Sequence, residues 1–514
     1  MYKPQLIVVG VDGGGFELIQ PWLEAGDLPN INSMLQGGVS GHLYSCLPPV
    51  TRPNWKCYAT GLNPGKLGMF WWAELDKQNM SFVHNAFSGN TESFWDILQD
   101  NGYQAGSINT PLTYNSHSRA KVLIAGGPDA LDCNFCTSDR LERELISKIG
   151  YQVHPKHQNS LEKDMIYETL ELINMRFKAA EYIMQNEQID FLQITSFYIN
   201  VLQHLYWNDD CVKEAWKIID KWIGHYLDQG ICIWVMSDHG SMPVDVEFSI
   251  NSWLTEKGYI ELVKTKSDLL AQLGINRKSV KSIIEKMGLK QMLRNRVPMK
   301  LRELIPDEEG RLVGQGGLNR IDKQRSSAFG LAQGPVYILN QENQKKQLIK
   351  KQLIEELKHV RHPEHGRYIA EDVLDAEVEY QNAGFWNAPD ILIKYGHGIQ
   401  ITGAVGYNGS FMKPRRWKAD NKQEGIFLAY GKDMATNTQI DLSILDLAPS
   451  ILHYFGVDIP ENMDGKIYKE VYSKESLPYH DQVQKTKHRV TDIDEQNNLS
   501  NVLEKRLQDL GYLK

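Results

Sequence analysis

The sequence predicts an α/β fold in which a mostly parallel central sheet has helices on both faces and carries a helical insertion. Short apolar runs alternate with longer amphipathic stretches, as strands and helices do in such folds. The length of 514 residues allows about three structural units, or one large α/β domain with insertions. The hydrophobic fraction of 42% and the charged fraction of 23% are ordinary for globular proteins, which excludes disordered and fibrous classes.

The first predicted strand is the apolar run from Leu6 to Val11, which is too short for a signal peptide and ends on Asp12. A long helix is expected over Leu161–Asn186, where apolar side chains recur at nearly helical spacing. A helix over Ile444–Phe455 is expected to end at Gly456. The other expected elements are a strand over Asp190–Thr195, a helix over Cys211–Asp228, and strands over Ile231–Met236, Ile391–Lys394 and Ile426–Ala429.

Charge and cysteine content narrow the class of protein. The net charge is −8, from 56 Lys and Arg against 64 Asp and Glu, so no nucleic-acid partner is predicted. No run reaches the roughly 18 apolar residues that a membrane-spanning helix needs. The six cysteines are too few for a disulfide framework, and the lone pair Cys133 and Cys136 is read as reduced in preference to a metal or redox site. We expect a cytoplasmic enzyme or binding protein.

Two segments differ from the rest of the chain. Residues 277–302 hold nine Lys and Arg against one acid, with apolar residues among them, which predicts a basic amphipathic helical insertion. A solvated face packed on the core is the first interpretation, and a cap over an anionic substrate or a contact with an anionic membrane surface are the alternatives. The tail is polar up to a short docking helix at Val502–Leu513. The expected division is a core of residues 1–262 and 312–478, an insertion at 263–311 and a tail at 479–514.

Candidate reactive side chains follow the predicted strands. Asp12 precedes three glycines, which let the backbone approach a ligand closely. Asp238 and His239 follow the strand over Ile231–Met236, and adjacent carboxylate and imidazole ligands at a strand end favour a divalent metal. Open α/β sheets bind ligands at the carboxyl ends of their strands, so a site is expected there.

Two further motifs are ambiguous when taken alone. Thr51 lies between prolines and fits a helix N-cap as well as a chemical role. Asn200 and His204 are four residues apart, which places both on one helical face, as a metal pair would require. A single His among apolar residues is nevertheless more often a packed core residue.

Several motifs follow one another along the chain in a fixed order, and that order is more informative than any single motif. They are the strand before Asp12-Gly, Pro-Pro-Val-Thr51, Thr60-Gly-Leu-Asn-Pro-Gly65, Gln203-His204-Leu-Tyr-Trp207, Ser237-Asp238-His239-Gly240, Gly425-Ile-Phe-Leu-Ala-Tyr-Gly431 and Asp446-Leu-Ala-Pro449. This set resembles the alkaline phosphatase superfamily, and within it the type I phosphodiesterase/nucleotide pyrophosphatase branch, over nearly the whole chain. The resemblance implies an alkaline-phosphatase-like fold.

The resemblance also implies two metal ions, usually zinc, held on either side of a Thr or Ser nucleophile. One site corresponds to Asp12, Thr51, Asp238 and His239, all present here. A bound cation favours the alkoxide of the Thr51 hydroxyl, which is otherwise a poor nucleophile at neutral pH. The implied activity is that of a metal-dependent hydrolase or group transferase acting on a phosphate ester through a covalent phospho-enzyme.

The second metal site departs from the family pattern. Asn200 stands where the family has Asp, His204 is kept, and Asn421 stands where the family has a later His. This site is therefore expected to be empty or to hold a weaker ion such as magnesium or manganese, and the substitutes considered for the lost ligands are Asp420, His397, Asp209 and Asp210. Leu67 replaces another family His, and Arg52 and Trp72 are the expected substrate contacts.

Two hypotheses follow for function. The first is an enzyme that acts on a small-molecule phosphate ester through Thr51, by hydrolysis or by transfer to another acceptor. The second is a catalytically weak homologue that binds a phosphorylated ligand or partner, because two ligands of one metal site are substituted. The sequence names neither the substrate nor the oligomeric state.

Overall fold

The structure is a computed structural model of the chain. It describes residues 2–83, 91–114, 116–156, 163–263, 270, 273, 275–286, 305–306, 312, 317–339, 342–381, 385–406, 409–487, 506–507 and 509–510. The chain forms two compact units. The first consists of Met1–Trp71, Phe87–Pro243 and Arg416–Leu503, and the second of Trp72–Ala86, Val244–Arg415 and Glu504–Lys514.

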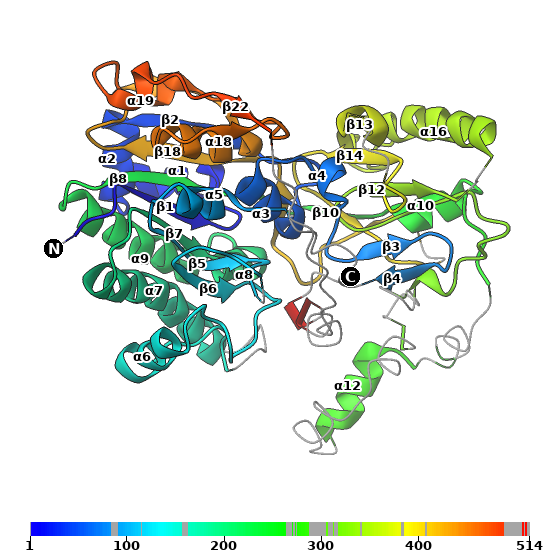
Figure 1. The fold of residues 1–514 in the computed structure, drawn as a ribbon. Helices are drawn as coiled ribbons and strands as arrows, with labels where there is room; N and C mark the ends of the chain where they lie inside the picture. Colours follow the sequence, from blue (N-terminus) through cyan, green and yellow to red (C-terminus); the bar gives the residue numbers. More distant parts are fainter. Residues whose placement is uncertain are drawn as a thin grey trace. The chain divides into compact units, whose positions relative to one another are not determined.

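The first unit is built on a sheet that has nine strands among the described residues, in the order β19-β2-β18-β8-β1-β7-β5-β6, with β20 beside β2 (Figure 1). Strand β1 pairs in parallel with β7 and β8, whereas β18 runs antiparallel to both of its neighbours. The predicted mostly parallel sheet is therefore confirmed. The strands are β1 (Leu6–Val11), β2 (Val39–Tyr44), β5 (Ala105–Pro111), β6 (Val122–Gly126), β7 (Phe191–Ser196), β8 (Cys232–Met236), β18 (Glu424–Tyr430), β19 (Thr438–Gln439) and β20 (Leu442–Ser443).

Helices cover both faces of this sheet. Alternate residues of β1 enter different cores, Ile7 and Val9 on one face and Leu6 and Val8 on the other, as the two-residue period of a strand requires. The first face carries α1 (Phe16–Glu24), α2 (Pro29–Gly37), α6 (Asp139–Ile149), α7 (Lys163–Asn186), α8 (Tyr198–Tyr206) and α9 (Asp210–Leu227). The second carries α3 (Thr51–Thr60), α5 (Phe94–Asp100) and α18 (Leu447–Tyr454).

The remaining elements of the first unit are short. Strand β9 (Gly240–Pro243) follows β8 and pairs antiparallel with β17 (Ala419–Lys422). Strands β21 (Ile459–Pro460) and β22 (Lys485–Thr486) pair in parallel. The others are α4 (Pro64–Leu67), α19 (Leu477–His480) and the 3₁₀ turns Ile444–Asp446 and Lys469–Val471.

The second unit contains smaller sheets. One has the order β11-β12-β14-β13, with bounds Ala328–Gly330, Pro335–Ile338, Ile391–Tyr395 and Ala370–Asp375. Another joins β15 (Ile399–Thr402), β10 (Val246–Ser249) and β16 (Phe411–Met412), and β3 (Glu74–Asp76) pairs with β4 (Ser81–Val83). Its helices among the described residues include α10 (Ile250–Glu256), α12 (Arg277–Lys286), α16 (Asn343–Lys358) and α17 (Ala376–Glu379).

The predicted elements mostly agree with the structure, with one clear correction. The segment Ile444–Phe455 is not one helix, because a 3₁₀ turn precedes α18. Ser443 and Asp446 form a capping box on that turn, and Pro449, which has no backbone N–H, is accommodated in the first turn of α18. Residues 161–162 of the expected long helix and most of the predicted docking helix lie outside the described residues. Of the basic segment 277–302, the structure describes the helix α12 (Arg277–Lys286), and residues 287–302 lie outside the described residues.

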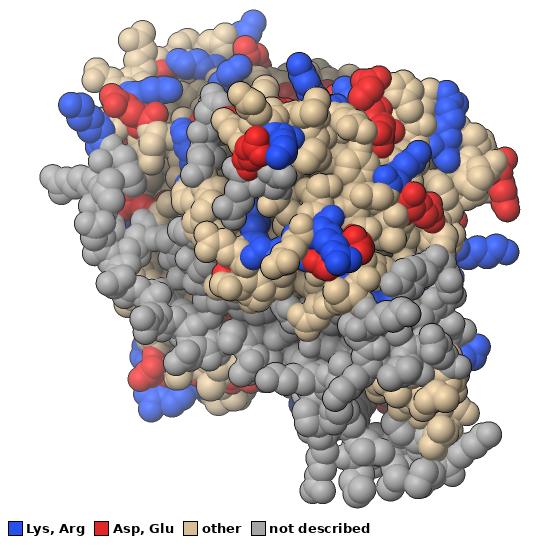
Figure 2. All heavy atoms as spheres, turned by 90° about the vertical axis from the view of Figure 1, so that its right-hand side faces the viewer, with Lys and Arg blue, Asp and Glu red and all other residues tan. Residues whose placement is uncertain are grey.

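Three surface and composition features complete the description. All six cysteines are free thiols. On the face shown in Figure 2, basic and acidic side chains are interspersed within the described part of the chain. Among the described helices, none combines the length and the apolar character needed to cross a membrane. The division into core, insertion and tail stays a prediction.

Candidate active site

The candidate site lies in the first unit, at the carboxyl ends of β1 and β8. These strands are parallel neighbours, with Gly10 opposite Met236, so the residues that follow them emerge at the same edge of the sheet. Asp12 follows β1, and Asp238 and His239 follow β8. Thr51 joins them as the first residue of α3, and all four side chains are completely buried.

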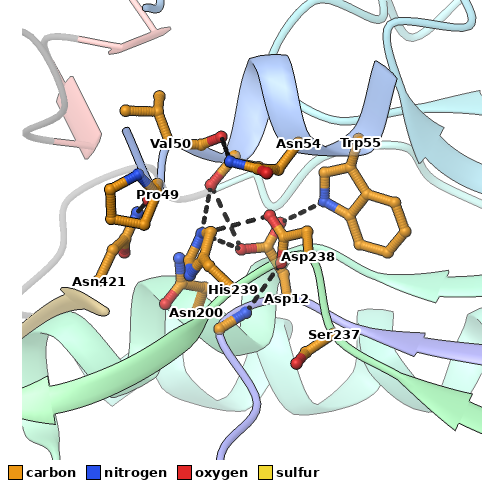
Figure 3. A network of polar contacts seen from close by, with 12 residues as sticks. Asp12, Pro49, Val50, Asn54, Trp55, Asn200, Ser237, Asp238, His239 and Asn421 are labelled. Carbon is orange, nitrogen blue, oxygen red and sulfur yellow. Dashed lines mark hydrogen bonds and ion pairs between the residues drawn. The ribbon is translucent and has the colours of Figure 1, made fainter. Parts of the chain in front are cut away.

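Four electron-rich atoms converge at this point (Figure 3). His239 Nε2 lies 3.0 Å from Thr51 Oγ1, 3.2 Å from Asp238 Oδ2 and 3.6 Å from Asp12 Oδ1. Thr51 Oγ1 lies 3.4 Å from the same Asp12 oxygen. Neighbouring ligands of a tetrahedral zinc ion with bonds of about 2.0 Å are about 3.3 Å apart. The observed separations are therefore those of a ligand set for one cation.

Second contacts orient each of these ligands. The other oxygen of Asp12 accepts a hydrogen bond of 2.9 Å from Trp55 Nε1, and the other oxygen of Asp238 accepts one of 3.2 Å from the backbone N–H of Gly13. His239 Nδ1 lies 2.9 Å from the carbonyl oxygen of Gly240, which can only accept, so Nδ1 carries the proton and Nε2 the lone pair. Asp12, Asp238 and His239 thus each have one atom fixed by the protein and one atom left for the site.

Burial shifts the ionisation of these groups. Burial is the main cause that raises the pKa of Asp12, and burial together with the nearby Asp12 carboxylate raises the pKa of Asp238 well above its usual range. Burial lowers the pKa of His239 to about 4, so its imidazole is neutral. Two buried carboxylates without a compensating charge are costly, and a divalent cation bound here would supply that charge. Among the described residues, Asp12, Asp238 and His239 form the one group of at least three His, Cys, Asp and Glu side chains whose ligand atoms all lie within 4.8 Å of one another.

The loop before Thr51 is fixed by Asn54. Its side-chain Nδ2 donates to the carbonyl oxygens of Val50 at 2.9 Å and Pro48 at 3.1 Å, and its Oδ1 accepts from the backbone N–H of Cys46 at 2.8 Å. The residue that caps α3 is Val50, so the N-cap interpretation of Thr51 is wrong. As the first residue of the helix, Thr51 lies at the positive end of its dipole, where negative charge is stabilised.

The second half of the predicted site has a different character. Asn200 and His204 lie on α8, and Asn421 lies on β17 opposite Ser241 of β9; all three candidates are buried. His204 Nδ1 is 2.9 Å from the carbonyl oxygen of Ala419, and its ring stacks on Trp417 with centroids 3.7 Å apart. Asn421 Nδ2 donates to the carbonyl oxygen of Pro49 at 2.7 Å. The second half of the predicted site therefore holds two amides and one imidazole, those of Asn200, Asn421 and His204.

Two of the considered substitutes, Asp209 and Asp210, are exposed at the start of α9 and are unlike buried ligands. Asp209 caps α9 by accepting from the N–H of Cys211, and the Asp210 side chain is 91% exposed. His397 belongs to the second unit. Asp420 is buried, and one of its oxygens accepts the backbone N–H of Asn421. The donor set on this side does not fit a zinc ion as the first half does.

The predicted substrate contacts are both buried. Arg52 follows Thr51, and its Nη1 donates to the carbonyl oxygen of Trp71 at 2.9 Å. Trp72 belongs to the second unit. Their contact with substrate stays a prediction.

Comparisons with known proteins agree with this architecture. The family model for type I phosphodiesterase/nucleotide pyrophosphatase matches residues 6–421, so the chain belongs to that family. Members of the family are metal-dependent phosphoryl-transferring hydrolases that act on phosphate esters. No curated protein matches the chain in sequence.

Among solved structures, the chain is similar to phosphonoacetate hydrolase from Sinorhizobium meliloti 1021 in complex with phosphonoformate. The TM-score is 0.54 at 14% sequence identity, and the match covers 87% of this chain and 95% of that chain. The predicted alkaline-phosphatase-like fold is thereby confirmed.

Sequence reasoning missed the residues that orient the ligands. Asn54 and Trp55 lie within four residues of Thr51, but the sequence alone assigns them no role. Gln203 is noted only as the neighbour of His204, and Ser241 is not singled out at all. The indole of Trp55 and the amide of Asn54 act on residues brought to them by the fold. Their proximity to the catalytic motif was the one signal that could have identified them.

Proposed function

We propose that this protein is a hydrolase or group transferase that acts on a small-molecule phosphate ester, with Thr51 as nucleophile and one divalent cation held by Asp12, Thr51, Asp238 and His239. The convergence of four buried side chains carries the proposal, since His239 Nε2 lies 3.0–3.6 Å from the oxygens of Thr51, Asp238 and Asp12. Zinc is the ion that a set of carboxylate, imidazole and hydroxyl ligands favours.

The reaction is a displacement at phosphorus. A cation bound by these side chains would lower the pKa of the Thr51 hydroxyl and neutralise charge on the phosphoryl group. With its proton released to water, Thr51 Oγ1 attacks phosphorus; the Oγ1–P bond forms and the bond from phosphorus to the leaving oxygen breaks, with the electron pair on that oxygen. Water or another acceptor hydroxyl then attacks phosphorus; the new O–P bond forms, the Oγ1–P bond breaks, and the proton lost by the acceptor is balanced by one that returns from solvent to Oγ1. Arg52 and Trp72 are the proposed contacts to the substrate.

The alternative function is a weak or inactive homologue that binds a phosphorylated ligand. The observation that favours it is the pair of amides, Asn200 and Asn421, at the second half of the site. Against it stands the arrangement of Thr51, since a binding protein has no need of a hydroxyl placed 3.0 Å from His239 Nε2. Whether the acceptor is water or another molecule is a separate question that the reaction products answer.

The test is the Thr51→Ala variant, assayed with bis(p-nitrophenyl) phosphate and p-nitrophenyl phosphate in zinc and in manganese. We expect turnover to fall at least about 10³-fold, because no atom remains to form the covalent bond. Thr51→Ser, which keeps the hydroxyl, should retain turnover within about tenfold. Equal turnover in wild type and Thr51→Ala would refute the nucleophile, and no turnover in any of them would support the binding alternative.

A further inference from the structure

The orientation of the Asn200 amide is set by a chain of hydrogen bonds. It begins at Trp216, whose indole N–H can only donate, and which lies 3.2 Å from Gln203 Oε1. The oxygen of the Gln203 amide is therefore the atom nearest Trp216, and its Nε2 points the other way. That nitrogen donates at 3.1 Å to the carbonyl oxygens of both Asp12 and Gly13, which confirms the assignment.

The same nitrogen then fixes Asn200. Gln203 Nε2 lies 3.4 Å from the Asn200 side chain, and because a donor needs an acceptor, the facing atom is Oδ1. Ser241 Oγ, which donates to the carbonyl oxygen of Gly13 at 2.7 Å, lies 3.5 Å from the same oxygen. Asn200 Oδ1 is thus held on the side of Gln203 and Ser241, and Nδ2 is turned away from them.

The resulting N–H group is buried beside the first metal ligand. Asn200 is completely buried, and its Nδ2 makes no hydrogen bond of ordinary length and angle among the described residues. It nevertheless faces Asp12, since hydrogen bonding from the Asn200 side chain is one of the causes that lower the pKa of that carboxyl against the larger effect of burial. A Cβ atom on Gly13, whose φ is +68°, would lie 2.3 Å from Asn200 Oδ1. The glycine after Asp12 therefore makes room for this amide.

An N–H group is the wrong atom for a cation. Its partial positive charge repels a metal ion, whereas the family Asp at this position presents a ligand oxygen. The second metal site of the family therefore does not fit these residues. The partner that an amide N–H does fit is a negatively charged oxygen, and such hydrogen bonds are the stronger ones in proteins.

We propose that Asn200 Nδ2 donates a hydrogen bond to a nonbridging oxygen of the phosphoryl group, in the place where family members hold a second cation. The inference rests on the proposed function, since it assigns a further residue to the same site. A preorganised neutral donor stabilises charge that develops on phosphoryl oxygens without the cost of binding a second ion.

The test measures binding of inorganic phosphate by calorimetry to protein loaded with one zinc per chain, with the ion content verified in each sample. Asn200→Ala removes the donor, and phosphate affinity is expected to fall about tenfold to hundredfold at unchanged zinc content. Asn200→Asp keeps the shape but places a carboxylate against the anion, so affinity should fall further at one zinc per chain. This variant also serves if Asn200→Ala does not fold.

The matched control is Asn251→Ala in the second unit. Asn251 is also buried, and its amide is satisfied by the carbonyl oxygens of Gly330 and Gly403, both at 2.8 Å, and by the N–H of Gly330. Its loss should lower the melting temperature but leave phosphate affinity within twofold of wild type.

Three results would overturn the proposal. Phosphate affinity within twofold of wild type in the Asn200 variants would remove the role of Asn200 while leaving the proposed function intact. Equal weakening by Asn251→Ala would show a general loosening of the fold. A millimolar site should be occupied at about 10 mM phosphate. If zinc-loaded wild type binds no phosphate at that concentration, the proposed function is overturned together with the inference.

Discussion

The two halves of the site use the same part of the fold for opposite chemistry. On one half, Asp12, Asp238 and His239 turn lone pairs toward a common point, and burial without a counter-charge raises the pKa of both carboxylates. On the other half, Asn200 holds a buried N–H group that makes no ordinary hydrogen bond among the described residues, and Asn421 Nδ2 donates to the Pro49 carbonyl oxygen. Under the proposed function, the number of bound cations depends on which atoms a few buried side chains present, on one and the same sheet edge.

The largest expected effect comes from breaking the first half. Asp238→Asn removes a charge and a ligand, so zinc affinity should fall by more than the roughly 100-fold seen for loss of outer contacts. Competition with a chromogenic chelator measures it. Asp220→Asn is the matched control, because Asp220 is a buried carboxylate of the same unit that accepts from Asn30 and the N–H of Ile31. Equal zinc affinity in wild type and Asp238→Asn would contradict the ligand set.

The next effect comes from converting the second half into the first. The double variant Asn200→Asp, Asn421→His is expected to bind two ions per chain. Asp at 200 keeps an oxygen toward Gln203 and places its second oxygen where the N–H now points, and His at 421 restores an imidazole. Elemental analysis of the dialysed protein measures the count. A count that stays at one would mean that features other than these two residues exclude the second ion.

A smaller effect is expected from the contacts that orient the ligands. Trp55→Phe removes the hydrogen bond to Asp12 Oδ2 and keeps most of the apolar volume, so zinc affinity should fall about 10- to 100-fold. Trp95→Phe, at a buried tryptophan of α5 in the same unit, should leave zinc affinity unchanged. If the two variants bind zinc equally, the Trp55 indole does not orient the carboxylate.

The smallest effect is a pH dependence of stability in the metal-free protein. Because the pKa values of Asp12 and Asp238 are raised in the folded state, that state keeps protons that the unfolded state releases above about pH 4. The free energy of unfolding therefore falls as the pH rises through the raised pKa values. His239, whose pKa is lowered to about 4, acts oppositely but only below about pH 6.5.

Of these three groups, therefore, only the two carboxylates change the free energy of unfolding between about pH 6.5 and pH 8.5. We expect the melting temperature in chelator to fall by a few degrees over this range, and the fall to be absent in zinc. Scanning calorimetry on wild type and Asp238→Asn checks it, since the variant should show a smaller fall. A melting temperature in chelator that rises from pH 6.5 to pH 8.5 in wild type but not in the variant would contradict the assignment.

The first half of the site was predictable because its residues lie next to elements that the sequence marks. Asp12, Asp238 and His239 each follow a short apolar run, and parallel strands bring such residues to one edge. Thr51 was identified by its motif, and the structure adds the 3.0 Å approach to His239.

The second half could be identified but not interpreted from the sequence. Asn200 was recognised as a substituted ligand, but whether it presents O or N–H depends on Trp216 and Ser241, which are distant along the chain. The same limit applies to the fold. The run Ile426–Ala429 predicts a strand, but an apolar run carries no direction, so the antiparallel pairing of β18 with β8 was not foreseen. The division into two compact units was not foreseen either.

The number of ions per chain is the most direct test of the proposed metal centre and of the donor role of Asn200. Purified protein would be dialysed against zinc, manganese and magnesium in turn and measured by elemental analysis. One ion per chain, lost in Asp238→Asn, is the predicted result. Two ions per chain in wild type would contradict the donor assignment of Asn200, and no bound ion would contradict the metal centre itself.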